Sequence, residues 1–177
     1  VNPALKPHQR DAVIWALKGG RRALFESFGL GKTAQQLEWA RLLHERTGVR
    51  VMIVCPLGVK QEFQLDAVRL LKWKSAPPYV RTDAEAAATD APIVLTNYER
   101  VRDGDINPKQ FGAVSLDEAS CLRSYGSKTY QQFLTILKGI PYKLVCTATP
   151  SPNKYKELIH YSGYLEIMDT GSCLTKW

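Results

Sequence analysis

The sequence predicts an α/β fold with a mostly parallel central sheet and helices on both faces. Short runs rich in β-branched residues alternate with longer runs of helical period, which is the pattern of strand–helix units. Residues 49–56 are a near-continuous β-branched run, as a strand buried on both faces is, and residues 91–99 predict another buried strand. A polar cluster follows each predicted strand. Since ligands gather at the carboxyl ends of parallel strands, these clusters should meet at one edge of the sheet.

The first half of the chain contains five of the predicted elements. Apolar residues recur at helical spacing over residues 5–20, and a Gly-Gly pair ends this helix. Residues 21–25 are short and apolar, which predicts a strand. An apolar stripe at every third residue predicts a helix over 34–43. The β-branched run 49–56 ends at a proline and predicts a buried strand, and helical spacing returns over 58–71.

The second half repeats the alternation. Residues 91–99 predict another buried strand, and residues 111–120 predict a strand that runs into polar residues. Residues 128–139 have helical spacing and end at a glycine. Residues 142–150 predict a further strand, and 154–167 predict a helix in their first two turns.

Composition limits the classes of protein that fit. A chain of 177 residues fits one domain that needs no disulfide or metal to fold. No segment resembles a membrane span or a signal peptide, so no membrane partner is expected. The net charge of +7 permits a polyanionic partner without proving one. The cysteines are far apart and form no C-x-x-C pair, which favours small buried hydrophobes and a reducing cytoplasm; they are Cys55, Cys121, Cys146 and Cys173.

The stretch FESFGLGKT, residues 25–33, joins a predicted strand to a predicted helix. Free backbone N–H groups and the helix dipole at such a junction favour a phosphate. Lys32 would reach the β- and γ-phosphates, and the Thr33 hydroxyl would hold Mg²⁺. The alternative is a simple loop that begins a helix. The strict phosphate-loop pattern has glycine where this chain has Glu26, so that carboxylate should point away from the phosphates.

Two neighbouring acids, Asp117 and Glu118, end the predicted strand 111–120. Asp117 can hold Mg²⁺ opposite the glycine loop, and Glu118 can orient and deprotonate the attacking water. An acidic pair at a strand end is by itself more often a solvated turn. The glycine loop upstream favours the catalytic interpretation.

The motifs together resemble those of superfamily-two helicases and translocases, in the detail of the Swi/Snf-type branch and its phage-encoded DEAD/DEAH-box relatives. The resemblance runs from about Leu5 to about Leu165. Its motifs, in chain order, are LKPHQRDAVIWAL, ESFGLGKT, MIVCPLGVKQEF, IVLTNYERVRDGD, LDEASCLRSYGSKTYQQF and LVCTATPSPNKYKEL. In this branch an acidic or small residue often replaces the first loop glycine, which accounts for Glu26. Ser120 departs from the pattern because the family has histidine there.

The resemblance implies a RecA-like P-loop NTPase lobe over residues 1–167, with 168–177 as the start of a linker to a second RecA-like lobe that lies outside this chain. That second lobe would supply an arginine finger, so the isolated lobe should be weakly active or inactive. The implied cofactors are ATP and Mg²⁺. The implied nucleic-acid contacts are Gly58, Lys60, Thr96, Tyr98 and Arg100, although Tyr98 is as well explained by packing. The implied nucleotide contacts are Gln9 on the adenine edge, then Phe28, Gly29, Leu30, Gly31, Lys32, Thr33 and Ala34.

The remaining implied roles concern catalysis and coupling. Thr33 and Asp117 would hold the metal, Lys32 and Glu118 would act with Asp117 in catalysis, and Thr147 and Thr149 would relay the nucleotide state to the nucleic-acid motifs. The predicted function is the ATP-binding lobe of an ATP-dependent DNA helicase or translocase, in a bacterial or phage-infected cell. The alternatives are the motor segment of a restriction or repair nuclease, and a nucleotide-dependent nucleic-acid-binding module without turnover. Duplex DNA is favoured over RNA by resemblance alone.

Overall fold

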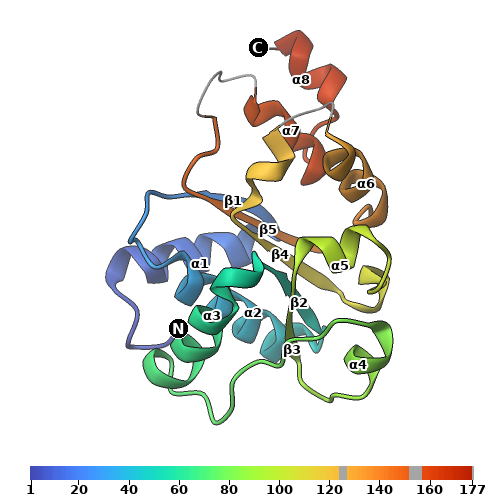
Figure 1. Ribbon diagram of the computed structural model, residues 1–177. Coiled ribbons are helices and arrows are strands. Elements are labelled where there is room, and N and C mark those ends of the chain that lie inside the picture. The colour runs from blue at the N-terminus through green and yellow to red at the C-terminus, as the bar shows by residue number, and fades with distance from the viewer. Residues whose placement is uncertain (124–126, 152–156, 177) are drawn as a thin grey trace.

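The central feature of the computed structural model is a parallel β-sheet with helices on both faces, as the sequence predicts (Figure 1). The structure describes residues 1–123, 127–151 and 157–176. Within these ranges the sheet has the strand order β1-β5-β4-β2-β3, and every pairing is parallel. The strands are β1 (Arg21–Phe25), β2 (Val51–Val54), β3 (Ile93–Thr96), β4 (Ala113–Asp117) and β5 (Tyr142–Thr147).

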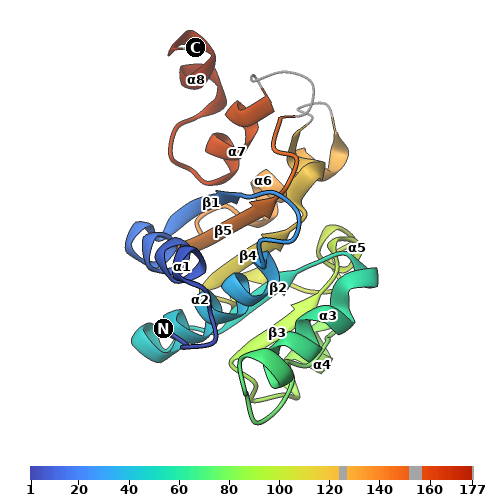
Figure 2. The same ribbon diagram turned by 90° about the vertical axis from the view of Figure 1, so that its left-hand side faces the viewer.

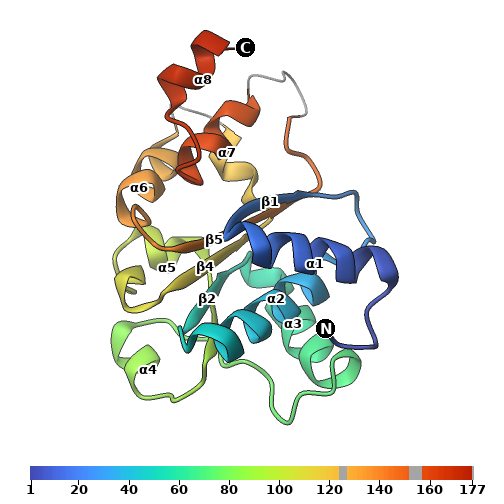
Figure 3. The same cartoon turned by 180° about the vertical axis from the view of Figure 1, so that it is seen from behind.

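Helices cover both faces of this sheet. The α-helices are α1 (Pro7–Gly19), α2 (Lys32–Thr47), α3 (Lys60–Leu65), α4 (Asp83–Ala87), α5 (Tyr98–Arg102), α6 (Lys128–Ile136), α7 (Leu158–Tyr164) and α8 (Thr170–Lys176). Shorter helical turns are η1 (Leu57–Val59), η2 (Asp66–Leu70), η3 (Pro108–Gln110) and η4 (Ala119–Arg123). Figure 2 shows the strands one below another in the order β1-β5-β4-β2-β3, and Figure 3 shows α1 and α2 in front of the sheet. None of the helices in the described ranges has the length and apolar character needed to span a bilayer.

Alternation along the strands divides the core into two clusters. In β2, Val51 and Ile53 pack with residues of α1, α2 and α3, whereas Met52 and Val54 pack with residues of α5, α6 and α7. Successive strand side chains point to opposite faces, so a strand covered on both sides must be apolar throughout. This explains why β2 and β3 are fully buried, unbroken apolar runs.

The strand register brings the carboxyl ends of the strands to one edge. Phe25 pairs with Thr147, and Cys146 pairs with Asp117. At the other side of β4, Leu116 pairs with Val54, which pairs in turn with Thr96. The polar clusters that follow the strands therefore share this edge, as predicted.

Two predicted strands are shorter than expected because helical turns begin early. The run 111–120 leaves the sheet after Asp117, where Glu118 has a left-handed φ of 50° and η4 follows. The run 91–99 ends at Thr96, and α5 begins at Tyr98. The predicted helix 58–71 is divided into η1, α3 and the π-helical η2.

Other differences lie in short or terminal segments. The helix α4 was not predicted, and its cap is a hydrogen bond of 3.2 Å from the Glu85 N–H to the Thr82 hydroxyl. The helix α8 occupies part of the predicted linker 168–177. Residues 124–126 of the fifth motif and 152–156 of the sixth lie outside the described residues. Of the predicted helix 154–167, α7 is the described part.

Candidate nucleotide and nucleic-acid site

The loop between β1 and α2 is shaped by two glycines in the left-handed region. Gly29 has a φ of 77° and Gly31 a φ of 79°, a conformation that side chains other than glycine rarely adopt. Gly31 is also the N-cap of α2, and a Cβ there would overlap the amide nitrogen of Gln9. The first hydrogen bond of α2 runs from the Gln35 N–H to the Gly31 carbonyl, so the three preceding N–H groups have no partner within the helix. These amides, of Lys32, Thr33 and Ala34, are available for an anion, and their contact with a phosphate stays a prediction.

The Lys32 ammonium lies inside this loop. It donates to the carbonyl oxygens of Glu26 at 3.0 Å and Ser27 at 3.1 Å. It also lies 5.6 Å from the ring centroid of Phe28, whose side chain is 74% exposed. The loop backbone therefore holds the Lys32 ammonium within the loop, and its contact with a phosphate chain stays a prediction.

Glu26 has a structural role that fits the expectation for its carboxylate. This carboxylate accepts a hydrogen bond of 2.7 Å from the side-chain amide of Gln35, which is fully buried on α2. The same Gln35 nitrogen donates to the carbonyl of Leu30 at 3.2 Å. Gln35 thus connects α2 to both ends of the loop, and the Glu26 carboxylate is hydrogen-bonded to it.

Gln9 contacts the same loop from α1. Its side chain is 8% exposed, and its nitrogen donates to the Leu30 carbonyl at 2.8 Å. Its oxygen accepts from the Lys6 N–H at 2.8 Å, in a capping box at the start of α1. One amide hydrogen of Gln9 is left for another acceptor, and contact with an adenine edge stays a prediction.

Asp117 lies at the end of β4 with a buried carboxylate. Its side chain is 8% exposed, and its Oδ1 accepts a hydrogen bond of 2.7 Å from the Gln36 amide. Burial raises the pKa of Asp117 to about 6, while the Gln36 hydrogen bond and the nearby Lys32 ammonium act in the opposite direction. The carboxylate is therefore mostly ionised at neutral pH. The strand register, in which Phe25 pairs with Thr147 and Cys146 with Asp117, places loop and acid at the same edge of the sheet.

Glu118 is held by the residues predicted to couple the site to nucleic acid. Its Oε1 accepts a hydrogen bond of 3.0 Å from the Thr147 hydroxyl, and that hydroxyl accepts from the Thr149 N–H at 3.1 Å. Glu118 has a left-handed φ of 50°, a conformation that costs a residue with a side chain about 1–3 kcal/mol. Strain of this kind persists where surrounding contacts enforce it, and it is common at functional sites.

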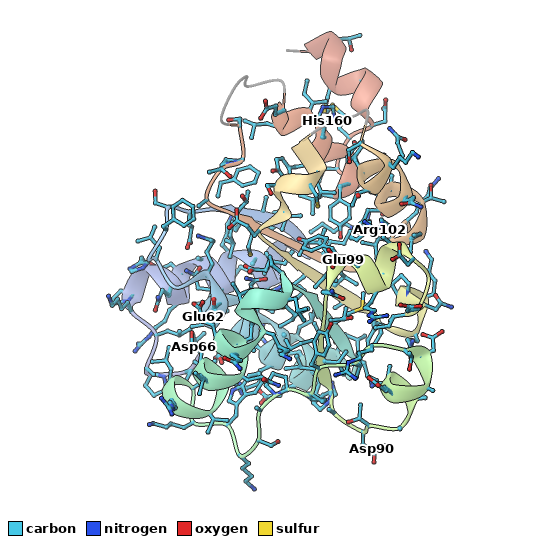
Figure 4. All side chains as sticks on the ribbon, in the orientation of Figure 1. Glu62, Asp66, Asp90, Glu99, Arg102 and His160 are labelled. Atoms are coloured by element: carbon cyan, nitrogen blue, oxygen red, sulfur yellow. The ribbon has the colours of Figure 1, made fainter. Side chains whose placement is uncertain are left out.

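Two residues that contact the predicted metal ligands were missed by the sequence reasoning. The Thr33 hydroxyl donates to Glu62 on α3 at 3.3 Å, and Figure 4 labels Glu62 together with Asp66. Gln36 contacts Asp117, as described above. The signal for Gln36 is its spacing, since residues three apart on a helix share a face and Gln36 follows Thr33 by three. Glu62 gives no comparable signal, because α2 and α3 meet only in the folded chain.

The predicted nucleic-acid contacts lie after β2 and β3 at the same edge. Gly58 is exposed in η1, and Lys60 begins α3 with its ammonium 4.9 Å from the ring centroid of Tyr79. Arg100 on α5 pairs with Asp105 at 2.7 Å and is 42% exposed. The structure thus places Lys60 and Arg100 where solvent reaches them, with Tyr79 as an unpredicted neighbour of Lys60.

Two predicted contacts need correction. The Thr96 side chain is fully buried, and its hydroxyl donates to the Val80 carbonyl at 2.9 Å, so it is not a donor to a phosphate outside. The Tyr98 ring stacks on Phe133 with centroids 5.7 Å apart, and its hydroxyl donates to the backbone carbonyl of Asp117 at 2.6 Å. These contacts support the packing interpretation of Tyr98 over stacking on a base. Burial raises the pKa of Tyr98 well above its usual value, so the hydroxyl remains a donor.

Comparison with protein families decides the affiliation of the chain. Residues 8–167 match the family model described as the SNF2-related domain. The chain belongs to this family. The family resemblance predicted from the motifs is thereby confirmed. In this SNF2-related domain, the matched residues include the glycine loop, the acid pair and the threonines at the end of β5.

Curated relatives of this SNF2-related domain are much longer proteins. It is 28% identical over 190 residues to the ATP-dependent helicase brm of Drosophila melanogaster, covering 99% of this chain and 12% of that protein. It is 25% identical over 184 residues to the TATA-binding protein-associated factor mot1 of Aspergillus fumigatus, covering 89% of this chain and 10% of that protein. The chain therefore spans about a tenth of the curated relatives it matches.

Solved structures with similar folds confirm the RecA-like lobe. The SWI2/SNF2 ATPase core of Sulfolobus solfataricus in complex with dsDNA superimposes with a TM-score of 0.76 at 20% identity, over 93% of this chain and 36% of that chain. The UvsW helicase of bacteriophage T4 gives a TM-score of 0.73 at 20% identity, over 90% of this chain and 57% of that chain. At these identities the likeness establishes the fold.

Proposed function

We propose that this SNF2-related domain binds Mg-ATP and, within a longer protein, couples its hydrolysis to movement on duplex DNA. The observation that carries the proposal is the meeting of the glycine loop, Asp117 and Glu118 at one sheet edge, with Glu118 hydrogen-bonded to Thr147. A second RecA-like lobe outside this chain would complete the site, so the isolated lobe is expected to hydrolyse ATP poorly.

The residues present fit a magnesium-bound triphosphate. The free amides at the start of α2 would surround the phosphates, and Lys32 would neutralise their charge. Thr33 and Asp117 would hold Mg²⁺, which supplies charge neutralisation at the β- and γ-phosphates. Glu118 would orient the attacking water and accept its proton. The hydrogen bond from Thr147 keeps the Glu118 carboxylate beside the end of β5.

The proposed nucleic-acid contacts are the Gly58 amide, Lys60 and Arg100. Contacts to the phosphate backbone suit a motor that must move regardless of sequence. The Sulfolobus solfataricus core, which has this fold, was solved in complex with dsDNA, which supports duplex DNA as the partner. Arg100 would give up its exposed pair with Asp105, which costs little because solvent screens exposed ion pairs.

The alternatives concern the protein around this lobe. A motor of a restriction or repair nuclease would use the same site, with the nuclease elsewhere in the parent chain. A module without turnover would keep nucleotide binding and lose hydrolysis. The presence of Lys32, Asp117 and Glu118 in the sequence argues against this alternative. The relatives come from Drosophila melanogaster and Aspergillus fumigatus, so they do not favour the predicted bacterial or phage-infected cell. A cytoplasmic location also stays a prediction.

The test uses the full-length parent protein with and without duplex DNA. Wild type should hydrolyse ATP faster when DNA is added. Lys32→Ala should lose nucleotide binding, whereas Glu118→Gln should bind nucleotide and stop turning over. Lys18→Ala, at an exposed lysine on α1, is the matched control and should behave as wild type. Full hydrolysis by Glu118→Gln would contradict the assigned role, and wild-type binding by Lys32→Ala would contradict the nucleotide site itself.

A further inference from the structure

We propose that Gln36 is a positioning residue for the magnesium site, which orients the carboxylate of Asp117 through its side-chain amide. The inference rests on the proposed function, because it assumes that Asp117 holds the cation of a bound nucleotide. Nothing in the motifs that predict this site assigns a role to Gln36.

The amide of Gln36 is fully used by two residues of β4. Its nitrogen donates to Oδ1 of Asp117 at 2.7 Å, and its oxygen accepts from the Ser115 hydroxyl at 2.7 Å. Gln36 and Ser115 are completely buried. Ser115 and Asp117 are two residues apart on a strand, so their side chains share the face that α2 covers. One glutamine therefore spans the two polar side chains that β4 presents to α2.

The Asp117 carboxylate fixes which end of the amide faces it, because an ionised carboxylate only accepts hydrogen bonds and so takes the nitrogen end of Gln36. The Ser115 hydroxyl then donates to Oε1 and anchors the other end of the amide. A hydrogen bond to an ionised acceptor is about twice as strong as a neutral one, and more so in a buried place. This arrangement limits rotation of the Asp117 carboxylate. Among the described residues, no hydrogen bond reaches its Oδ2.

The position of Gln36 on α2 connects the two proposed metal ligands. Thr33 and Gln36 are three residues apart, so they lie on the same face of the helix. That face presents a metal-binding hydroxyl in the first turn and an orienting amide one turn later. Tyr98 holds the backbone carbonyl of Asp117 at 2.6 Å, so side chain and backbone of this residue are fixed by different elements.

A purely structural role for Gln36 makes a different prediction from a positioning role. If the amide merely satisfies buried groups, its loss should lower stability and leave cation affinity unchanged. If it orients Asp117, its loss should lower the affinity for the cation and leave the affinity for nucleotide in the absence of a cation unchanged. Loss of a residue that orients a metal ligand typically costs about 10- to 100-fold in metal affinity.

The experiment measures binding of a fluorescent ATP analogue to the full-length protein as Mg²⁺ is titrated, and again in EDTA. Gln36→Met keeps the length of the side chain and removes the amide. It should raise the half-saturating Mg²⁺ concentration by about tenfold or more while binding in EDTA stays at the wild-type level. The same substitution at Gln132, which is exposed on α6, is the matched control and should leave the titration unchanged.

Ser115→Ala serves as the second variant, and it decides the matter if Gln36→Met does not fold. It removes the hydrogen bond that anchors the oxygen end of the Gln36 amide while leaving Gln36 in place. The amide should then hold the Asp117 carboxylate less firmly, and the half-saturating Mg²⁺ concentration should rise by about threefold, which corresponds to the loss of part of one hydrogen bond. The proposal would be overturned if the folded variants had half-saturating Mg²⁺ concentrations within twofold of the wild-type value. Wild-type nucleotide binding by Lys32→Ala in the same assay would instead overturn the proposed function, so the two failures are distinguishable.

Discussion

Replacement of Lys143 by methionine should remove a pH dependence from the stability of this chain. Lys143 lies in β5 with a side chain only 2% exposed, at the far end of the strand from Thr147. Its ammonium donates to the Tyr164 carbonyl at 2.9 Å, and Glu166 lies 3.6 Å away. Burial lowers the pKa of Lys143 to about 8, although Glu166 acts to raise it.

The direction of the effect follows from proton binding. Between pH 8 and 10.5 the unfolded chain keeps the proton on this lysine and the folded chain loses it. Stability should therefore rise with pH across this window, and the full cost of the buried charge applies below pH 8. One pKa unit corresponds to about 1.4 kcal/mol, so the shift sets a ceiling of about 3 kcal/mol.

Urea unfolding at pH 7, 8, 9 and 10.5, followed by tryptophan fluorescence, measures this difference. Tyrosines also titrate near pH 10, but they are present in both proteins and cancel when wild type is compared with Lys143→Met. The stability of wild type relative to the variant should increase by up to about 3 kcal/mol from pH 8 to 10.5. Lys18→Met, at an exposed position on α1, should run parallel to wild type. Parallel curves for wild type and Lys143→Met would refute the buried-charge argument.

Three further predictions concern the site. Gly31→Ala should lower nucleotide affinity by about tenfold or more, because its Cβ would push the Gln9 amide away from the Leu30 carbonyl and so disturb the loop. Gly48→Ala, with a φ of 74° and open space, should cost only about 1 kcal/mol of stability in urea unfolding. Glu118→Gly should be more stable than Glu118→Ala by about 1 kcal/mol, because both lose the Thr147 hydrogen bond and only glycine relieves the left-handed strain, and both should abolish ATP turnover; equal stability of the two variants would contradict this. Log affinity for duplex DNA falls as log salt concentration rises, and Lys60→Ala should make this fall less steep by about 0.9, whereas Lys18→Ala should leave it unchanged.

Sequence reasoning predicted where the glycine loop and the acid pair lie, because both depend on local order. The glycines at 29 and 31 need left-handed backbone wherever they occur, and the lysine and threonine after them open a helix. The acid pair ends a strand, and the parallel sheet brings it to the same edge as the loop. Fold class, strand edge and family were therefore predictable from residues that are close in sequence.

What was missed depends on contacts between distant segments. Thr96 follows an apolar run, as other predicted nucleic-acid contacts do. Its hydrogen bond to the Val80 carbonyl, which forms only in the folded chain, shows that its hydroxyl faces the interior. In the sequence, Tyr98 looks like an aromatic residue at the end of a strand. In the structure it begins α5, and its ring packs against Phe133. The short helices α4 and α5, five residues each, are too short to show a helical period.

The Lys32 and Thr33 side chains already have hydrogen-bond partners within the protein, and this affects how a nucleotide would bind. Lys32 is held by the carbonyls of Glu26 and Ser27, and the Thr33 hydroxyl is held by Glu62. A triphosphate with its cation must take over these contacts, so hydrogen bonds are exchanged and their net contribution is small. The free amides at the start of α2 have no partner within the helix to give up. The favourable part of binding should therefore come from these amides and from the cation between Thr33 and Asp117, which is why the orientation of the Asp117 carboxylate matters.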